Sequence, residues 1–124
     1  MIAADTSSMV AFLQGEPGED ADLIQSALDH QQLVLPPVVL AELLSDPALP
    51  RLVRTLLAGL PILEIEPGFW VRAGVLRASL LKRKKKARVA DALIAQSCLD
   101  QSTPLVTRDR DFRHFAAAAG LPLL

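Results

Sequence analysis

Residue types that build several common kinds of functional site are scarce in this sequence. Cysteine occurs once, at Cys98, so no disulfide can form within the chain. This residue sits in an apolar stretch with no nearby base, which predicts a buried core thiol and not a nucleophile. The two histidines, His30 and His114, have neither a histidine partner at helical spacing nor a cysteine partner. We therefore expect both at the surface and no zinc site.

Aromatic residues are also few, and tyrosine is absent. The four phenylalanines and Trp70 make up 4% of the chain and fall at positions typical of a hydrophobic core. The sequence therefore predicts no aromatic platform of the kind that stacks on single-stranded bases. Long apolar runs are missing too, and the amino-terminal segment has no basic stretch. We expect no secretory signal, no membrane span and a cytoplasmic protein.

Positively charged residues are absent from the first part of the chain. Residues 1–50 contain eight acidic residues and no Lys or Arg, whereas residues 51–124 contain thirteen Lys or Arg and six acidic residues. The densest basic stretch spans residues 82–88. The net charge of −1 hides this asymmetry, which indicates a polyanionic partner or a partner protein that covers one surface.

The length of 124 residues and the hydrophobic content of 51% are typical of a single globular domain that spans residues 1–124. Short apolar runs that predict strands lie at residues 2–4, 33–35, 61–65, 104–107 and 121–123. Stretches that predict helices lie between Asp5 and Gly15 and at residues 21–29, 38–44, 51–58, 68–81, 89–99 and 109–119. This alternation predicts an α/β fold with a short, mainly parallel sheet.

Acidic residues lie near the ends of the predicted strands, where ligand sites form in open α/β sheets. Asp5 ends the first strand, and Asp109 and Asp111 follow a late one. Asp91 begins the helix before that late strand, and Glu42 lies on an apolar helix after the second strand. Asp5, Asp91 and Asp109 can each serve instead as a helix cap or first-turn acid. Glu42 either extends to solvent or meets a cation.

If these carboxylates converge, they need a counter-charge. Two of them a few ångströms apart repel by roughly 4 kcal/mol at an effective dielectric constant of 20. Mg²⁺ or Mn²⁺ removes this conflict, because hard cations prefer carboxylate oxygens, and such sites cleave phosphate esters. Thr6 and Thr107, next to Asp5 and Asp109, are expected either to position water or phosphate or to serve as capping and strand residues.

Four segments together resemble those of the PIN domain family, and more narrowly those of the VapC-type toxin ribonucleases of bacterial toxin–antitoxin pairs. They are residues 2–7 (IAADTS), 39–43 (VLAEL), 89–95 (VADALIA) and 105–112 (LVTRDRDF). They occur in the family's order and span most of the chain.

The resemblance implies a Rossmann-like three-layer α/β/α sandwich, bound Mg²⁺ or Mn²⁺, and endoribonuclease activity on single-stranded or structured RNA. It also implies a homodimer and inhibition by a cognate antitoxin protein. Asp5, Glu42 and Asp91 match the family's first three metal-binding and catalytic acids. The fourth is either Asp109 or Asp111, and Asp109 is preferred because it follows the strand more closely.

The basic stretch before Asp91 departs from the family pattern. Lys84, Lys85, Lys86 and Arg88 are expected either to hold the RNA backbone or to keep an exposed loop soluble. Two other segments suggest protein partners. The predicted helices at 51–58 and 68–81 carry more apolar residues than one core-facing stripe needs, which favours a homodimer.

Two other functions fit part of this pattern. A PIN-like module that binds RNA or a partner without turnover has the same acids. A phosphoacceptor receiver domain has a similar size and an α/β fold, but it needs paired acids after the first strand and a Lys after a late strand. This sequence has a lone Asp5 at the first position and Arg108 after Thr107 at the second.

Overall fold

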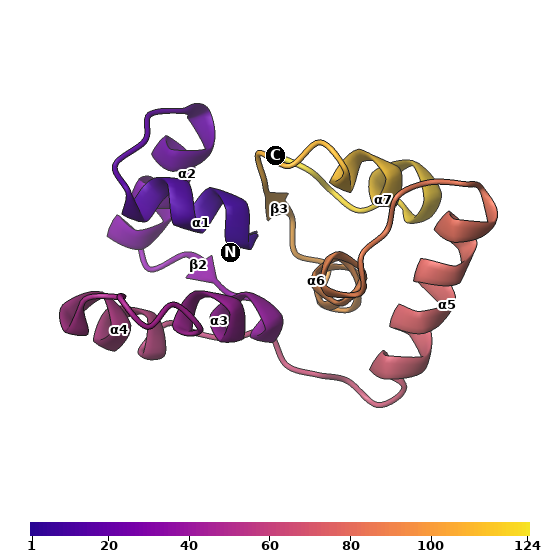
Figure 1. The fold of residues 1–124 in the computed structure, drawn as a ribbon, viewed down its shortest axis with the longest axis horizontal. Helices are drawn as coiled ribbons and strands as arrows, with labels where there is room; N and C mark the ends of the chain where they lie inside the picture. The colour runs from indigo at the N-terminus through magenta and orange to yellow at the C-terminus, as the bar shows by residue number, and fades with distance from the viewer.

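Three short parallel strands form the centre of the computed structural model, which describes residues 1–124 (Figure 1). They are β1 (Ile2–Ala4), β2 (Leu33–Val34) and β3 (Leu105–Val106). β1 lies between the other two, so that Ala3 pairs with Val34 on one side and with Leu105 on the other. Nearly all the strand side chains are buried, which explains why these runs are apolar without alternation.

Seven helices surround the strands. They are α1 (Thr6–Leu13), α2 (Glu19–Asp29), α3 (Pro37–Leu44), α4 (Arg51–Ala58), α5 (Phe69–Lys82), α6 (Val89–Asp100) and α7 (Phe112–Ala119). Figure 1 shows α1 and α2 on one side of the strands and α3 and α6 on the other, with α5 packed outside α6. The predicted α/β fold with a parallel sheet between helical layers is confirmed. None of the helices is both long and apolar enough to span a membrane.

Two predicted strands are reduced to single bridges at the edges of the sheet. Of residues 61–65 only Ile62 pairs, with Leu35, and of residues 121–123 only Leu123 pairs, with Leu105. At the first edge, Ile62 and Ile65 are 41% and 42% exposed, so little packing extends the strand. At the second edge, Pro122 has no N–H with which to continue a ladder.

The last helix begins three residues later than predicted. The Asp109 side chain accepts a hydrogen bond from the Asp111 N–H at 2.9 Å, and α7 begins only at Phe112. Asp side chains that bond the backbone two residues ahead form a turn that competes with the helix. This turn leaves Asp109 and Asp111 in the loop between β3 and α7.

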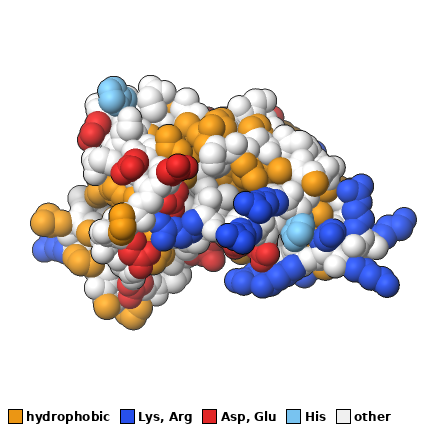
Figure 2. Space-filling model, turned by 90° about the horizontal axis from the view of Figure 1, so that it is seen from above, with side chains coloured by type: hydrophobic (Ala, Val, Ile, Leu, Met, Phe, Trp, Pro, Cys, Tyr) orange, Lys and Arg blue, Asp and Glu red, His pale blue; other side chains and the backbone are white.

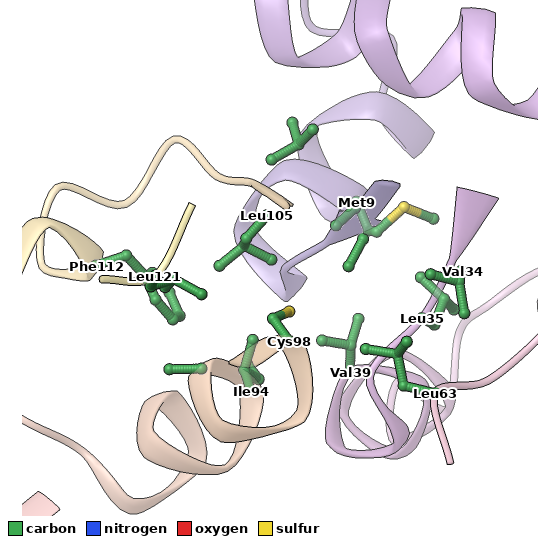
Figure 3. Close-up of a cluster of buried hydrophobic side chains, with 14 of the residues drawn as sticks. Met9, Val34, Leu35, Val39, Leu63, Ile94, Cys98, Leu105, Phe112 and Leu121 are labelled. Carbon is green, nitrogen blue, oxygen red and sulfur yellow. The ribbon is translucent and has the colours of Figure 1, made fainter. Parts of the chain in front are cut away.

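The hydrophobic core is formed by the strands together with the inward faces of all seven helices. Figure 3 labels ten of its residues: Met9, Val34, Leu35, Val39, Leu63, Ile94, Cys98, Leu105, Phe112 and Leu121. Cys98 is fully buried, as predicted, and burial raises the pKa of its thiol to about 12. The prediction of a core position was wrong for Trp70, whose neighbour Phe69 occupies the core instead. Trp70 is 66% exposed.

The helix α4 offers a matched test of the core assignment, since Leu57 is fully buried and Leu52 is 85% exposed. We expect Leu57→Ala to lower the free energy of unfolding by about 2–4 kcal/mol, because it leaves a cavity. We expect Leu52→Ala to change it by less than about 0.5 kcal/mol. Urea denaturation of both variants measures the difference. Equal losses would contradict the packing of α4.

Candidate active site

Asp5 is the buried centre of the candidate site and lies directly after β1. It is 2% exposed and caps the amino terminus of α1, because its Oδ1 accepts a hydrogen bond from the Ser8 N–H at 2.9 Å. The Ser7 hydroxyl donates to both carboxylate oxygens. Burial raises the pKa of Asp5, while these hydrogen bonds oppose the rise. The capping role and the candidate ligand role therefore fall on the same side chain.

Thr107 joins Asp5 to the loop that follows β3. Its hydroxyl donates to Asp5 Oδ2 at 2.7 Å and accepts a hydrogen bond from the Asp109 N–H at 3.0 Å. This one side chain therefore fixes the ends of two neighbouring strands relative to each other. Its hydroxyl is committed to the protein itself, which agrees with a structural role for Thr107.

Asp91 enters the site from the first turn of α6. Burial raises its pKa to about 6, and the negative charges of Asp109, Asp5 and Asp111 add to this rise, while Arg88 opposes it. The structure thus brings four of the five predicted acids within electrostatic reach of one another. The sequence alone did not establish the position of Asp91.

The two acids of the β3–α7 loop differ in their surroundings. The charge of Asp109 raises the pKa of both Asp5 and Asp91, whereas Asp111 contributes only to that of Asp91. Asp111 also forms an ion pair with Lys86, with 3.6 Å between Nζ and Oδ2. Asp109 is therefore the more central member of the cluster.

Glu42 lies at the margin of this cluster, on the exposed face of α3. Its Oε1 accepts a hydrogen bond from the Thr6 hydroxyl at 2.7 Å, and Thr6 directly follows Asp5. The sequence predicts that Glu42 either extends to solvent or meets a cation, and in the structure its side chain is exposed to solvent. The Thr6 bond nevertheless holds Glu42 next to the start of α1.

The carboxylates are close in electrostatic terms but are not assembled as ligands. No three His, Cys, Asp or Glu side chains are near enough to one another to hold a metal ion as they stand. His30 is exposed, as predicted, and its Nδ1 hydrogen-bonds the Ser26 carbonyl. His114 is half-buried instead, and its N–H donates to the Asp111 carbonyl. The side-chain atoms that hydrogen-bond Asp5, or whose charge raises its pKa, are hydroxyl and carboxylate oxygens.

The basic residues form a separate surface beside the acids. Figure 2 views the molecule from the upper side of Figure 1, and most Asp and Glu side chains on this face lie on its left, most Lys and Arg side chains on its right. Lys84, Lys85, Lys86 and Arg88 are all exposed in the segment between α5 and α6. Only Lys86 contacts an acid of the site.

The sequence analysis did not identify the residues that hydrogen-bond Asp5 and support it from outside the acidic cluster. Ser7 and Ser8 bind Asp5, and the Ser8 hydroxyl also donates to Asp20 at 2.9 Å. Asp20 in turn accepts two hydrogen bonds from Arg108. The run of capping residues after Asp5 signals the first of these contacts, but no local pattern pairs residues 20 and 108.

The fold is similar to that of solved toxin–antitoxin structures. A chain of VapBC-1 from nontypeable Haemophilus influenzae matches with a TM-score of 0.78 at 19% identity, over 100% of this chain and 97% of that one. A chain of VapBC2 from Rickettsia felis, bound to a DNA fragment from its promoter, matches with a TM-score of 0.76 at 21% identity, over 100% and 98%. VapBC-5 from Mycobacterium tuberculosis, described as a member of the VapBC family of toxin–antitoxin systems, gives 0.65 at 20% identity, over 99% and 96%.

The sequence itself matches a family model. No curated protein matches it. The model of the PIN domain matches residues 2–118, which include every acidic residue of the candidate site. The four segments that resembled this family are therefore part of one continuous match. This chain belongs to the PIN domain family.

Proposed function

We propose that this PIN domain is a VapC-type toxin that cleaves RNA as a metal-dependent endoribonuclease. The observation that carries the proposal is the electrostatic cluster of Asp5, Asp91 and Asp109 beyond the ends of β1 and β3. Structural networks of charges usually pair opposite signs, whereas this cluster gathers like charges in a partly buried place. Strongly perturbed carboxylates of this kind mark functional sites. A phosphoacceptor function gains no support from the family match.

The chemistry of these residues fits Mg²⁺ or Mn²⁺. All the donors are carboxylate or hydroxyl oxygens, and a divalent cation lowers the cost of ionising Asp91 beside three other acids. We propose Asp5, Asp91, Asp109 and Glu42 as the residues that hold it, with Asp111 as the alternative to Asp109. When bound, the ion supplies an activated water and charge stabilisation at the scissile phosphate.

The other residues of the site orient these acids and the substrate. Thr107 and Ser7 fix the rotation of the Asp5 carboxylate, and Thr6 fixes that of Glu42. Lys84, Lys85 and Lys86 are exposed, and Lys86 pairs with Asp111 of the site. We propose that all three bind the RNA backbone by charge. The exposed Trp70 is not part of this cluster, so recognition depends on phosphate contacts and RNA shape.

The partner that we propose is an antitoxin, as in the VapBC structures of similar fold. A groove of about 220 Å³ next to the site is lined by apolar residues of α1, α3 and α4 and by Glu42 and Asp46. An apolar segment that carries a basic residue matches this lining. An Arg suits the acids best, because its planar guanidinium binds carboxylates with two hydrogen bonds.

A second copy of the chain is the partner that we propose for another groove, between α5 and α6. This groove of about 320 Å³ is lined mostly by apolar residues, and Trp70, Leu81 and Val89 at its rim are 66%, 46% and 55% exposed. Exposed apolar side chains gathered around one groove are a surface that a protein partner can cover. This agrees with the apolar excess of residues 68–81.

Asp5→Asn tests the catalytic assignment. We expect RNA cleavage with Mn²⁺ to fall on the order of a hundredfold or more, because a neutral amide is a poor ligand for the ion. The fold should persist, since the Asn oxygen can still cap α1. Cleavage of a fluorescent RNA and the melting temperature are measured together, with chelator as the metal control. Full activity would remove Asp5 from the site, and an inactive wild type would favour a binding module without turnover.

Asp91→Asn tests the repulsion within the cluster through its pH dependence. The pKa of Asp91 in the folded protein, about 6, is above its unfolded value, so its ionisation destabilises the fold as the pH rises through 6. We expect the variant to be more stable than wild type by about 1–2 kcal/mol at pH 7.5, after allowance for solvent screening, and equally stable below about pH 4. Thermal melts from pH 3.5 to 8 measure this.

Asp100→Asn, at the other end of α6, is the control of opposite sign. Arg72 holds the pKa of Asp100 below its usual range, so this carboxylate stabilises the fold above its unfolded pKa. Its replacement should destabilise the protein at pH 7.5. The same sign for both variants would contradict the like-charge environment of Asp91.

Replacement of Lys84, Lys85 and Lys86 by Ala tests the basic surface. We expect weaker RNA binding and a salt dependence whose log–log slope falls by roughly 0.7 for each lost phosphate contact. Turnover at saturating RNA should change little. Fluorescence anisotropy at several salt concentrations measures the slope, with Arg51→Ala on α4 as the control. An unchanged slope would make this segment a solvated loop.

A further inference from the structure

Arg108 forms a three-contact clamp outside the acidic cluster. Its Nε and Nη2 donate to the two carboxylate oxygens of Asp20 at 2.7 and 2.9 Å, and its Nη1 donates to Glu16 at 2.9 Å. The Arg108 side chain is 33% exposed and that of Asp20 is 12% exposed. The Arg108 hydrogen bonds lower the pKa of Asp20 to about 2. The pair is therefore charged and fixed in orientation at neutral pH.

This clamp holds the loop that carries Asp109. Arg108 lies between Thr107, which donates to Asp5, and Asp109, whose N–H bonds back to Thr107. β3, which precedes the loop, contains only two residues. The backbone ladder therefore ends before the site begins, and side-chain contacts determine where Asp109 lies.

At the other end of the clamp, Asp20 is bound by Ser8, the residue whose N–H donates to the helix cap Asp5. Ser8 is fully buried, its N–H donates to Asp5 and its hydroxyl donates to Asp20. The clamp also needs space at Gly18. A Cβ at that position would lie 2.5 Å from Asp20 Oδ1 and 3.2 Å from Arg108 Nη2. The chain thus leaves room for the ion pair and links it to both sides of the site.

We propose that Arg108 and Asp20 are positioning residues that set the affinity of the acidic cluster for a divalent cation by fixing Asp109 against Asp5. This inference rests on the proposed metal-dependent function. Outer contacts that orient ligands change metal affinity by about 10–100-fold when they are lost. If Arg108 acted only through its charge, its replacement would increase the metal affinity, because removal of a nearby positive charge strengthens cation binding. Arg108→Gln therefore separates positioning from charge.

The experiment compares Arg108→Gln and Asp20→Asn with Arg72→Gln in the full chain. Arg72 is a matched control, because it forms the same two-contact pair with Asp100 on α5 and α6, at 3.0 and 2.6 Å. Mn²⁺ affinity is measured by titration calorimetry. We expect about a tenfold loss in Arg108→Gln, a similar loss in Asp20→Asn and in the double variant, and no loss in Arg72→Gln. Tighter or unchanged Mn²⁺ binding in Arg108→Gln overturns the proposal.

Hydrogen exchange of the metal-free proteins gives an independent measurement. The Asp109 and Asp111 amides, which bond to Thr107 and Asp109, should exchange about tenfold faster in Arg108→Gln and at the wild-type rate in Arg72→Gln. Wild-type exchange rates in Arg108→Gln overturn the clamp whatever the protein binds. If wild type binds no Mn²⁺ while these amides exchange faster in the variant, the proposed metal function fails and the clamp remains.

Discussion

The hydrogen bond between the Thr107 hydroxyl and the buried Asp5 carboxylate is the contact on which the geometry of the acidic cluster depends. It joins residues 102 positions apart, at the ends of the central strand and its neighbour. Because β2 and β3 have two residues each, the backbone ladder supplies few contacts of its own. Asp5 also accepts hydrogen bonds from Ser7 and Ser8, and Thr107 leads into the turn at Asp109, so these contacts form one connected network. The order of the site follows from side chains more than from the sheet.

The site collects like charge in a partly buried place, which raises the pKa of Asp5 and Asp91. Burial and three neighbouring acids keep the pKa of Asp91 near 6, while Asp20 and Asp100, each paired with an Arg, have lowered pKa values. Arg side chains thus pair with Asp20, Glu16 and Asp100 outside the cluster, whereas inside it only Asp111 has an ion pair, with the exposed Lys86. Proteins hold such strained arrangements mainly at functional sites, where a ligand relieves them.

Much of the fold was predictable from local sequence patterns. The apolar runs at residues 2–4 and 33–35 and the capping residues after Asp5 gave the strand and helix order, because each signal lies within a few residues. The strand content of segments 61–65 and 121–123 was overestimated. Whether an edge segment pairs along its length depends on the whole sheet, which a local pattern does not show. Trp70 was misplaced for a related reason: a helix with apolar residues on several sides does not reveal which side packs.

In the candidate site, too, some positions follow from the local sequence and others depend on residues far apart in the chain. The position of Asp5 follows from its strand, but the approach of Asp91 and the pairing of Arg108 with Asp20 depend on tertiary packing. The different surroundings of Asp109 and Asp111 likewise appear only in the folded loop, where Asp109 accepts the hydrogen bond of the turn and Asp111 pairs with Lys86.

The strand order also determines when the site can form during synthesis. β1 precedes both of its neighbours in the sequence, and its second edge has no partner until β3 has been made. Until then the nascent chain has Asp5 without Thr107, and Asp20 without Arg108. A chain interrupted anywhere before residue 105 therefore has no complete acidic site.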